Sequence, residues 1–91
     1  MASPPIQYEA APDVQVILKL IKRGEVVEEL EANINVSKTT LELKQSLSKP
    51  LQMGVEYIDI YKGSVQLQDN VSLMDYEIST DETLIIMDKT P

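Results

Sequence analysis

A short apolar run near the C-terminus constrains the fold more than any other stretch of the sequence. Residues Thr83 to Met87 read Thr-Leu-Ile-Ile-Met, and every side chain after the threonine is apolar. A strand with one face in water alternates polar and apolar residues, whereas a strand with neighbours on both sides tolerates a continuous apolar run. The run therefore predicts a central strand, with Leu84 and Ile86 pointing inward and Ile85 and Met87 outward.

Two alternating stretches near the N-terminus predict a hairpin. Apolar residues occupy every second position from 14 to 20 and again from 30 to 36, and glutamate or asparagine fills the positions between in the second stretch. Lys22-Arg23-Gly24-Glu25 lies between them, and Gly24 tolerates the positive φ of a tight turn. We expect two antiparallel strands, each with one apolar face.

The apolar period then changes to that of a helix over residues 39–49. Thr39 and Glu42 have the spacing of a capping box, and Leu43 and Leu47 are four residues apart, on one helical face. Pro50 disfavours helical geometry in the residue before it, so the helix is predicted to end at or near Lys49. A helix of this length crosses a small sheet once.

The predicted elements make one α+β domain. A β-rich run at 57–61 and a short strand at 66–68 complete a mixed four- to five-stranded sheet with one helix packed across it. We assign residues 14–88 to this domain. Residues 1–13, which contain three prolines, are expected to form a flexible leader, and residues 89–91 a tail.

Composition argues against several classes of function. The formal charge is −7, which repels nucleic acid and anionic membrane surfaces. The chain contains no cysteine and no histidine, so it lacks the usual zinc ligands, the thiolate nucleophile and the most common general base. We expect no enzyme activity, no catalytic residue, no metal and no cofactor.

Localisation follows from what the sequence lacks. No run approaches the roughly 20 apolar residues that a membrane span requires, and the first residues do not resemble a secretory signal. We expect a monomer in the cytoplasm or nucleus.

One motif resembles a known family. Leu67 is followed by Ser72-Leu73-Met74-Asp75-Tyr76-Glu77-Ile78 and then by the apolar run at 83–87. This order resembles the C-terminal third of ubiquitin-like domains, and Ile60-Tyr61-Lys62-Gly63 is similar to the family's third strand and turn. The resemblance implies a β-grasp fold, a core that includes Leu67 and Leu73, and a Tyr76 hydroxyl hydrogen-bonded to the backbone of the preceding loop.

The resemblance also implies a function and a surface. Ubiquitin presents an apolar patch to partner domains, and the equivalent positions here are Ile21, Ile60 and Met87, with Ile85 beside them. It implies a noncovalent docking module, an adaptor in the ubiquitin–proteasome pathway, with a ubiquitin-receptor domain or a proteasome subunit as partner. Alignment from Gly63 places Asp59 at a core position, so either the strand has a bulge or Ile60 is core and Asp59 lies outside.

Two alternatives stay open. Conjugated modifiers end in Gly-Gly, whereas this sequence ends in Met-Asp-Lys-Thr-Pro, so a modifier would have to lack its diglycine tail here. The second alternative is charge pairing between the acidic hairpin and a basic partner domain. The hairpin acids are Glu25, Glu28, Glu29 and Glu31. We interpret the carboxylate pairs Asp75–Glu77 and Asp81–Glu82 as solvated turn residues.

Overall fold

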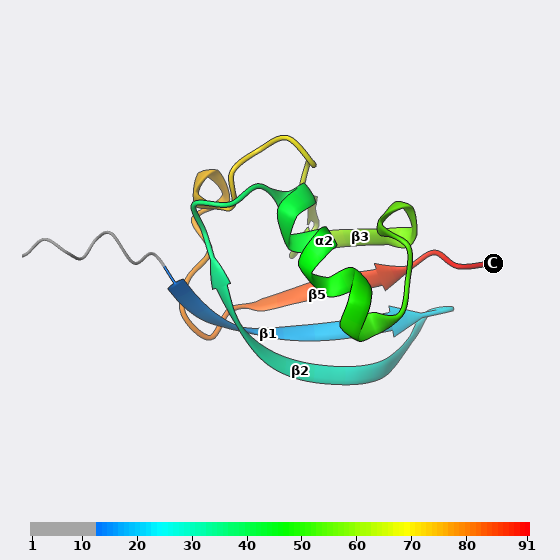
Figure 1. Cartoon of the computed structure of the whole chain (residues 1–91). Coiled ribbons are helices and arrows are strands. Elements are labelled where there is room, and N and C mark those ends of the chain that lie inside the picture. Colours follow the sequence, from blue (N-terminus) through cyan, green and yellow to red (C-terminus); the bar gives the residue numbers. More distant parts are fainter. Residues whose placement is uncertain (1–12) are drawn as a thin grey trace, which may run out of the picture.

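The computed structural model describes residues 13–91, and they form a five-stranded mixed sheet with one α-helix across it (Figure 1). The strand order is β2-β1-β5-β3-β4, so β5 (Thr83–Asp88) is the central strand. It runs parallel to β1 (Asp13–Lys22) and antiparallel to β3 (Ile58–Lys62). The prediction that the apolar run has neighbours on both sides is confirmed. Asp13 begins β1, and the rest of the predicted leader lies outside the described residues.

The N-terminal hairpin pairs β1 with β2 (Glu25–Asn35) over their full lengths. The two turn residues, Arg23 and Gly24, have φ values of 54° and 81°. Positive φ at both positions is what a type I′ turn requires, and this turn matches the twist of the strands that it joins. The ladder shifts register between Leu20 and Ile21, which makes a bulge at Val27 in β2. The sequence did not indicate this bulge.

Helix α2 (Thr40–Leu51) begins with the predicted capping box. The Glu42 amide donates to Thr39 Oγ1 at 3.2 Å, and the Thr39 amide donates to Glu42 Oε1 at 2.8 Å. The helix continues two residues beyond Lys49, with Pro50 inside its last turn, and it ends at Gln52 in a left-handed conformation. The predicted end was therefore short, because a proline in the last turn removes one hydrogen bond without forcing the chain out of the helix.

The C-terminal half supplies two short 3₁₀ turns and a minimal edge strand. The turn η1 (Val55–Tyr57) leads into β3, and β4 (Val65–Gln66) pairs with the end of β3. The second turn, η2 (Leu73–Tyr76), lies within the motif at 72–78 that resembles ubiquitin-like domains. Its Tyr76 hydroxyl accepts a hydrogen bond of 2.8 Å from the Gln68 amide, as the resemblance implied. The short strand predicted at 66–68 thus lies at 65–66 instead. It ends directly before Leu67, which is a core residue.

The hydrophobic core lies between α2 and the inner face of the sheet and contains no aromatic ring among its fully buried members. Its buried apolar residues are Val16, Leu18, Ile34, Val36, Leu43, Leu47, Ile58, Ile60, Leu67, Leu73, Ile78, Leu84 and Ile86. Leu84 and Ile86 are among them, which confirms the inward side of β5. Within residues 13–91, no helix has the length and apolar character to cross a membrane.

Candidate protein-binding face

Strand pairing brings a row of apolar side chains together on the sheet face that points away from α2. In the parallel ladder Ile21 lies opposite Met87, and in the antiparallel ladder Tyr61 lies opposite Ile85. Paired residues point to the same side of a sheet, so these four side chains share one face. Ile17 and Val26 share it as well, because Val26 pairs with Ile21 and Ile17 lies two residues before Lys19, the partner of Ile85.

We define the outer face by its apolar members, which are Ile17, Ile21, Val26, Tyr61, Ile85 and Met87. Val26 is 55% exposed and Met87 is 37% exposed, and the other four are partly exposed. Helix α2 lies on the opposite side of the sheet, where it packs over Leu84 and Ile86 (Figure 1). Contiguous apolar side chains left in water on a small domain mark an interaction surface more often than scattered ones do.

Three of the four residues expected in the binding patch lie on the outer face, and the fourth does not. Ile60 is fully buried and lies opposite Ile86, which faces the helix. The expectation that Ile60 belongs to the binding patch was therefore wrong, and the alternative with Ile60 in the core and Asp59 outside is the one that the structure has. The β3–β4 turn consists of Gly63 and Ser64, and Lys62 pairs with Val65, so Tyr61 occupies the outward position beside Ile85.

The sequence did contain a signal for Tyr61. If Ile58 and Ile60 both point inward, alternation leaves Asp59 and Tyr61 outward. The structure has this arrangement, with Ile58 and Ile60 both buried and no register shift between β3 and β5. The alternative of a bulge in this strand is thereby excluded.

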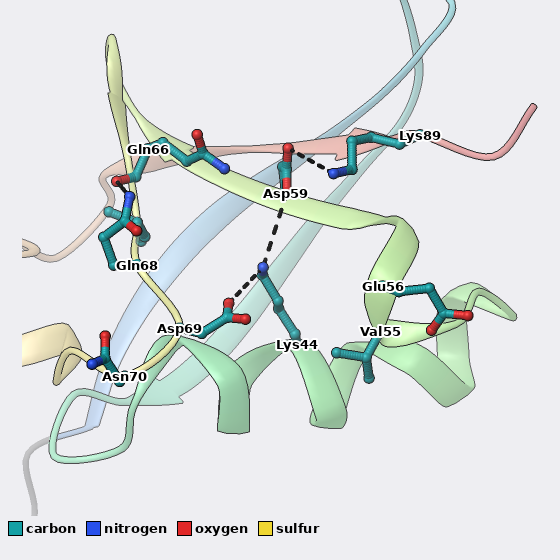
Figure 2. Close-up of a pocket in the computed structure, with 10 residues that line it drawn as sticks. Lys44, Val55, Glu56, Asp59, Gln66, Gln68, Asp69, Asn70 and Lys89 are labelled. Atoms are coloured by element: carbon teal, nitrogen blue, oxygen red, sulfur yellow. Dashed lines mark hydrogen bonds and ion pairs between the residues drawn. The ribbon is translucent and has the colours of Figure 1, made fainter.

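Asp59 is tolerated because two lysines reach it (Figure 2). Its side chain is only 14% exposed, and its carboxylate lies 3.4 Å from Lys89 Nζ and 4.0 Å from Lys44 Nζ. Lys44 comes from the buried side of α2 and makes its closest ion pair with Asp69, at 2.7 Å. A buried carboxylate without such partners would be strongly unfavourable, so this cluster fixes the register of β3.

Charged residues interrupt the outer face, since Lys19 lies opposite Ile85 and Asp59 lies opposite Met87. Lys19 lies between Ile17 and Ile21 on β1, opposite Glu29 of β2. At the end of β5, on the side of the sheet that Leu84 and Ile86 occupy, the Asp88 carboxylate lies 3.7 Å from Lys22 Nζ and accepts hydrogen bonds from the side chain and amide of Thr90. These hydrogen bonds, the side-chain one first, hold the pKa of Asp88 below its usual value. The carboxylate is thus ionised and already partnered at neutral pH.

The carboxylates of the described residues do not form a metal site. Residues 13–91 contain no group of three acidic or metal-binding side chains placed to hold a metal ion. Asp75, Glu77 and Asp81 are exposed, as expected for turn residues. Glu82 is partly buried instead, because it accepts from the Ser79 amide at 2.9 Å and lies 3.7 Å from Lys62 Nζ. It is a structural cap of the loop before β5, which the sequence interpretation had not assigned.

Comparison with solved structures places this arrangement in a known fold. The chain matches the ubiquitin-like domain of Arabidopsis thaliana protein At2g32350 with a TM-score of 0.78 and 14% identity, covering 98% of this chain and 90% of that one. It matches the UBL domain of Plasmodium falciparum Dsk2 with a TM-score of 0.69 and 26% identity, over 84% and 97% of the two chains. A design based on ubiquitin matches at 0.70 and 16%, over 88% and 93%.

The chain has the ubiquitin-like β-grasp fold. The resemblance inferred from the C-terminal motif is thus confirmed at the level of the fold. No protein-family model and no curated sequence matches the chain. Among the described residues, the outer face is the candidate functional site that we consider further.

Proposed function

We propose that this ubiquitin-like domain is a noncovalent docking module that binds another protein through its outer face. The observation that carries the proposal is the continuity of Ile21, Met87, Ile85 and Tyr61 across three neighbouring strands. Each such side chain, when fully buried by a partner, contributes about 1.5–3 kcal/mol before the entropic cost of association is subtracted. Together they are sufficient for micromolar binding.

The pattern of apolar and charged side chains on the outer face favours an amphipathic helix as the element that a partner contributes. The outer face is a sheet surface with a central apolar row and charged residues, Lys19 and Asp59 among them, on either side. An amphipathic helix presents a matching apolar stripe with a polar rim. A helix of a ubiquitin-receptor domain or of a proteasome subunit, in the cytoplasm or nucleus, is the partner that the fold suggests.

The direct test is an amide-shift titration of the ¹⁵N-labelled domain with a ubiquitin-binding helix as the probe. We expect shifts to cluster at Ile21, Tyr61, Ile85 and Met87. Shifts confined to α2, or the absence of shifts at saturating probe, would show that the outer face is not the binding surface.

A matched pair of methionine variants separates binding from stability. Met87→Ser removes an apolar side chain that is 37% exposed on the outer face, and Met74→Ser removes one that is 53% exposed on η2, away from it. We expect Met87→Ser to weaken binding of the probe by about tenfold, the loss of roughly 1.4 kcal/mol, while Met74→Ser leaves it unchanged. Equal effects of the two variants would contradict the proposal.

A further inference from the structure

Five apolar residues of the outer face form a diagonal row, which we call the apolar row. Val26 of β2 pairs with Ile21 of β1, and Ile21 pairs with Met87 of β5. Two residues before Met87, Ile85 pairs with Tyr61 of β3. The row crosses four strands, a distance of about 14 Å, which is the length of roughly ten residues of an α-helix. A helix laid along the row therefore has one flank on each side of it.

The side of the apolar row that lies towards the start of β1 is acidic. Glu29 lies next to the row, opposite Lys19, and Glu31 follows it along β2, opposite Ile17. Both glutamates are exposed, and within residues 13–91 neither makes an ion pair. Gln15 donates to Glu31 at 3.2 Å, and this neutral amide leaves the charge of Glu31 in place. Lys19 balances one of the two acids, so this side of the row is left negatively charged.

The opposite side of the apolar row has enough cations to balance its acid. The carboxylate of Asp59 lies 3.4 Å from Lys89 Nζ and 4.0 Å from Lys44 Nζ. The exposed Arg23 lies in the turn between β1 and β2, at the same end of the sheet. The two sides of the apolar row thus differ in charge, and a helix bound along the row meets both.

The chain itself does not supply a suitable helix for the apolar row. Leu43 and Leu47, the apolar stripe of α2, are buried in the core, so a second copy cannot lay that stripe on the row. Residues 1–12 contain no lysine or arginine, so they do not provide a basic flank. The net charge of −7 makes two copies repel one another and attracts basic partners. A helix of another protein is therefore the occupant that fits.

We propose that the partner helix carries lysine or arginine along the flank that faces Glu29 and Glu31, and neutral or acidic residues along the flank that faces Asp59 and Lys89. Turning a helix end to end on the row exchanges its two flanks. The charge difference across the apolar row therefore fixes the direction in which the helix runs. The proposal rests on the proposed docking function and adds to it the chemistry and the direction of the partner helix.

The test titrates three synthetic helices into the ¹⁵N-labelled chain at low salt. The helices share one apolar stripe and carry lysine, glutamine or glutamate along one flank. We expect the lysine helix to bind about fivefold more tightly than the glutamine helix, and the glutamate helix to bind more weakly than either. If the glutamine helix binds the outer face and lysine adds no affinity, the charge proposal is overturned while the docking function stands. Failure of all three helices to bind would contradict the docking function itself.

Paired charge variants show which acids cause the added affinity. Glu29→Gln with Glu31→Gln should abolish most of the fivefold advantage of the lysine helix and leave the affinity of the glutamine helix unchanged. Glu56→Gln with Glu77→Gln, which removes the same charge from exposed residues outside the sheet, should leave the advantage in place. Equal loss with both pairs would reduce the advantage to net charge and contradict the proposal.

The direction of the bound helix is measured with a nitroxide label at its N-terminus. Two lysine helices are compared, which carry their lysines on opposite flanks of the same apolar stripe. We expect the label to broaden amide signals near Val26 with one helix and near Tyr61 with the other, because the lysines turn towards Glu29 and Glu31 in both complexes. Broadening at the same end of the apolar row with both helices would overturn the proposal.

Discussion

Lys44 is the residue that most depends on its neighbours. Its side chain is 8% exposed, and its ammonium group is held by Asp69 at 2.7 Å and Asp59 at 4.0 Å. Replacing Asp69 by alanine leaves a buried cation with only the longer contact. Because Asp69 itself is about half exposed, we expect a loss of about 1–2 kcal/mol in the free energy of unfolding.

The control for this experiment is Asp75→Ala. Asp75 is exposed and makes no ion pair within the described residues, so its replacement should change the free energy of unfolding by less than about 0.5 kcal/mol. Urea denaturation of both variants decides the matter. If both lose the same stability, the Lys44 cluster has no special role in holding α2 to β3.

Glu42 gives the fold a dependence on acid. The Thr39 amide donates to its carboxylate, which is the main reason that the pKa of Glu42 lies below its ordinary value of 4.5. Since the pKa is lower in the folded than in the unfolded chain, the ionised group stabilises the fold at neutral pH. That contribution disappears as the pH falls from about 4.5 through the folded pKa.

We therefore expect Glu42→Ala to destabilise the domain at neutral pH and to differ less from the parent well below the folded pKa. Urea denaturation of both proteins across this range measures the difference. If the difference in the free energy of unfolding between the parent and the variant stays constant with pH, the capping hydrogen bonds, and not the charge of Glu42, account for the effect.

At the scale of elements, the turn between β1 and β2 is the clearest local constraint. Gly24 has a φ of 81°, and a Cβ added there would meet no atom within 4 Å, so the penalty for another residue is conformational and not steric crowding. We expect Gly24→Ala to cost about 1 kcal/mol, while Gly24→Asn should cost less because asparagine adopts positive φ more readily. Thermal unfolding of the two variants gives the order, and equal melting temperatures would argue against the type I′ turn.

The elements differ in how far the sequence alone predicted them. The hairpin, the start of α2 and the strand β5 depend on local periodicity and capping, and the structure confirms each. The third strand was ambiguous because Ile58, Asp59, Ile60 and Tyr61 fit two registers equally well. The contacts that select one, from Asp59 to Lys44 and Lys89, connect segments far apart in the sequence and leave no local signal.

The residues of the candidate site differ in the same way. Ile21, Ile85 and Met87 were predictable because β1 and β5 have unambiguous patterns, whereas Tyr61 replaced Ile60 only once the register of β3 was known. The exposed Val26 depends on a bulge, and a bulge is set by strand pairing and not by residue type. Glu29 and Glu31 lie beside these residues only because of the strand order of the whole sheet.

At the scale of the whole molecule, strand β5 contributes side chains both to the hydrophobic core and to the outer face. Adjacent side chains on this central strand point to opposite sides of the sheet, since Leu84 is fully buried under α2 while Ile85 lies on the outer face. Leu84 is 0% exposed, and its neighbours in the buried core are aliphatic side chains. We expect Leu84→Ala to lower the free energy of unfolding by about 2–5 kcal/mol, a large share of the roughly 5–15 kcal/mol of a small domain.

Ile85→Ala should behave in the opposite way, with stability reduced by less than about 1 kcal/mol and binding of the ubiquitin-binding helix clearly weakened. Denaturation and titration of the two variants side by side test whether stability and binding depend on two adjacent residues of one strand. Comparable losses of stability in both would mean that the outer face is covered in the folded protein, and the docking surface proposed for it would no longer be available.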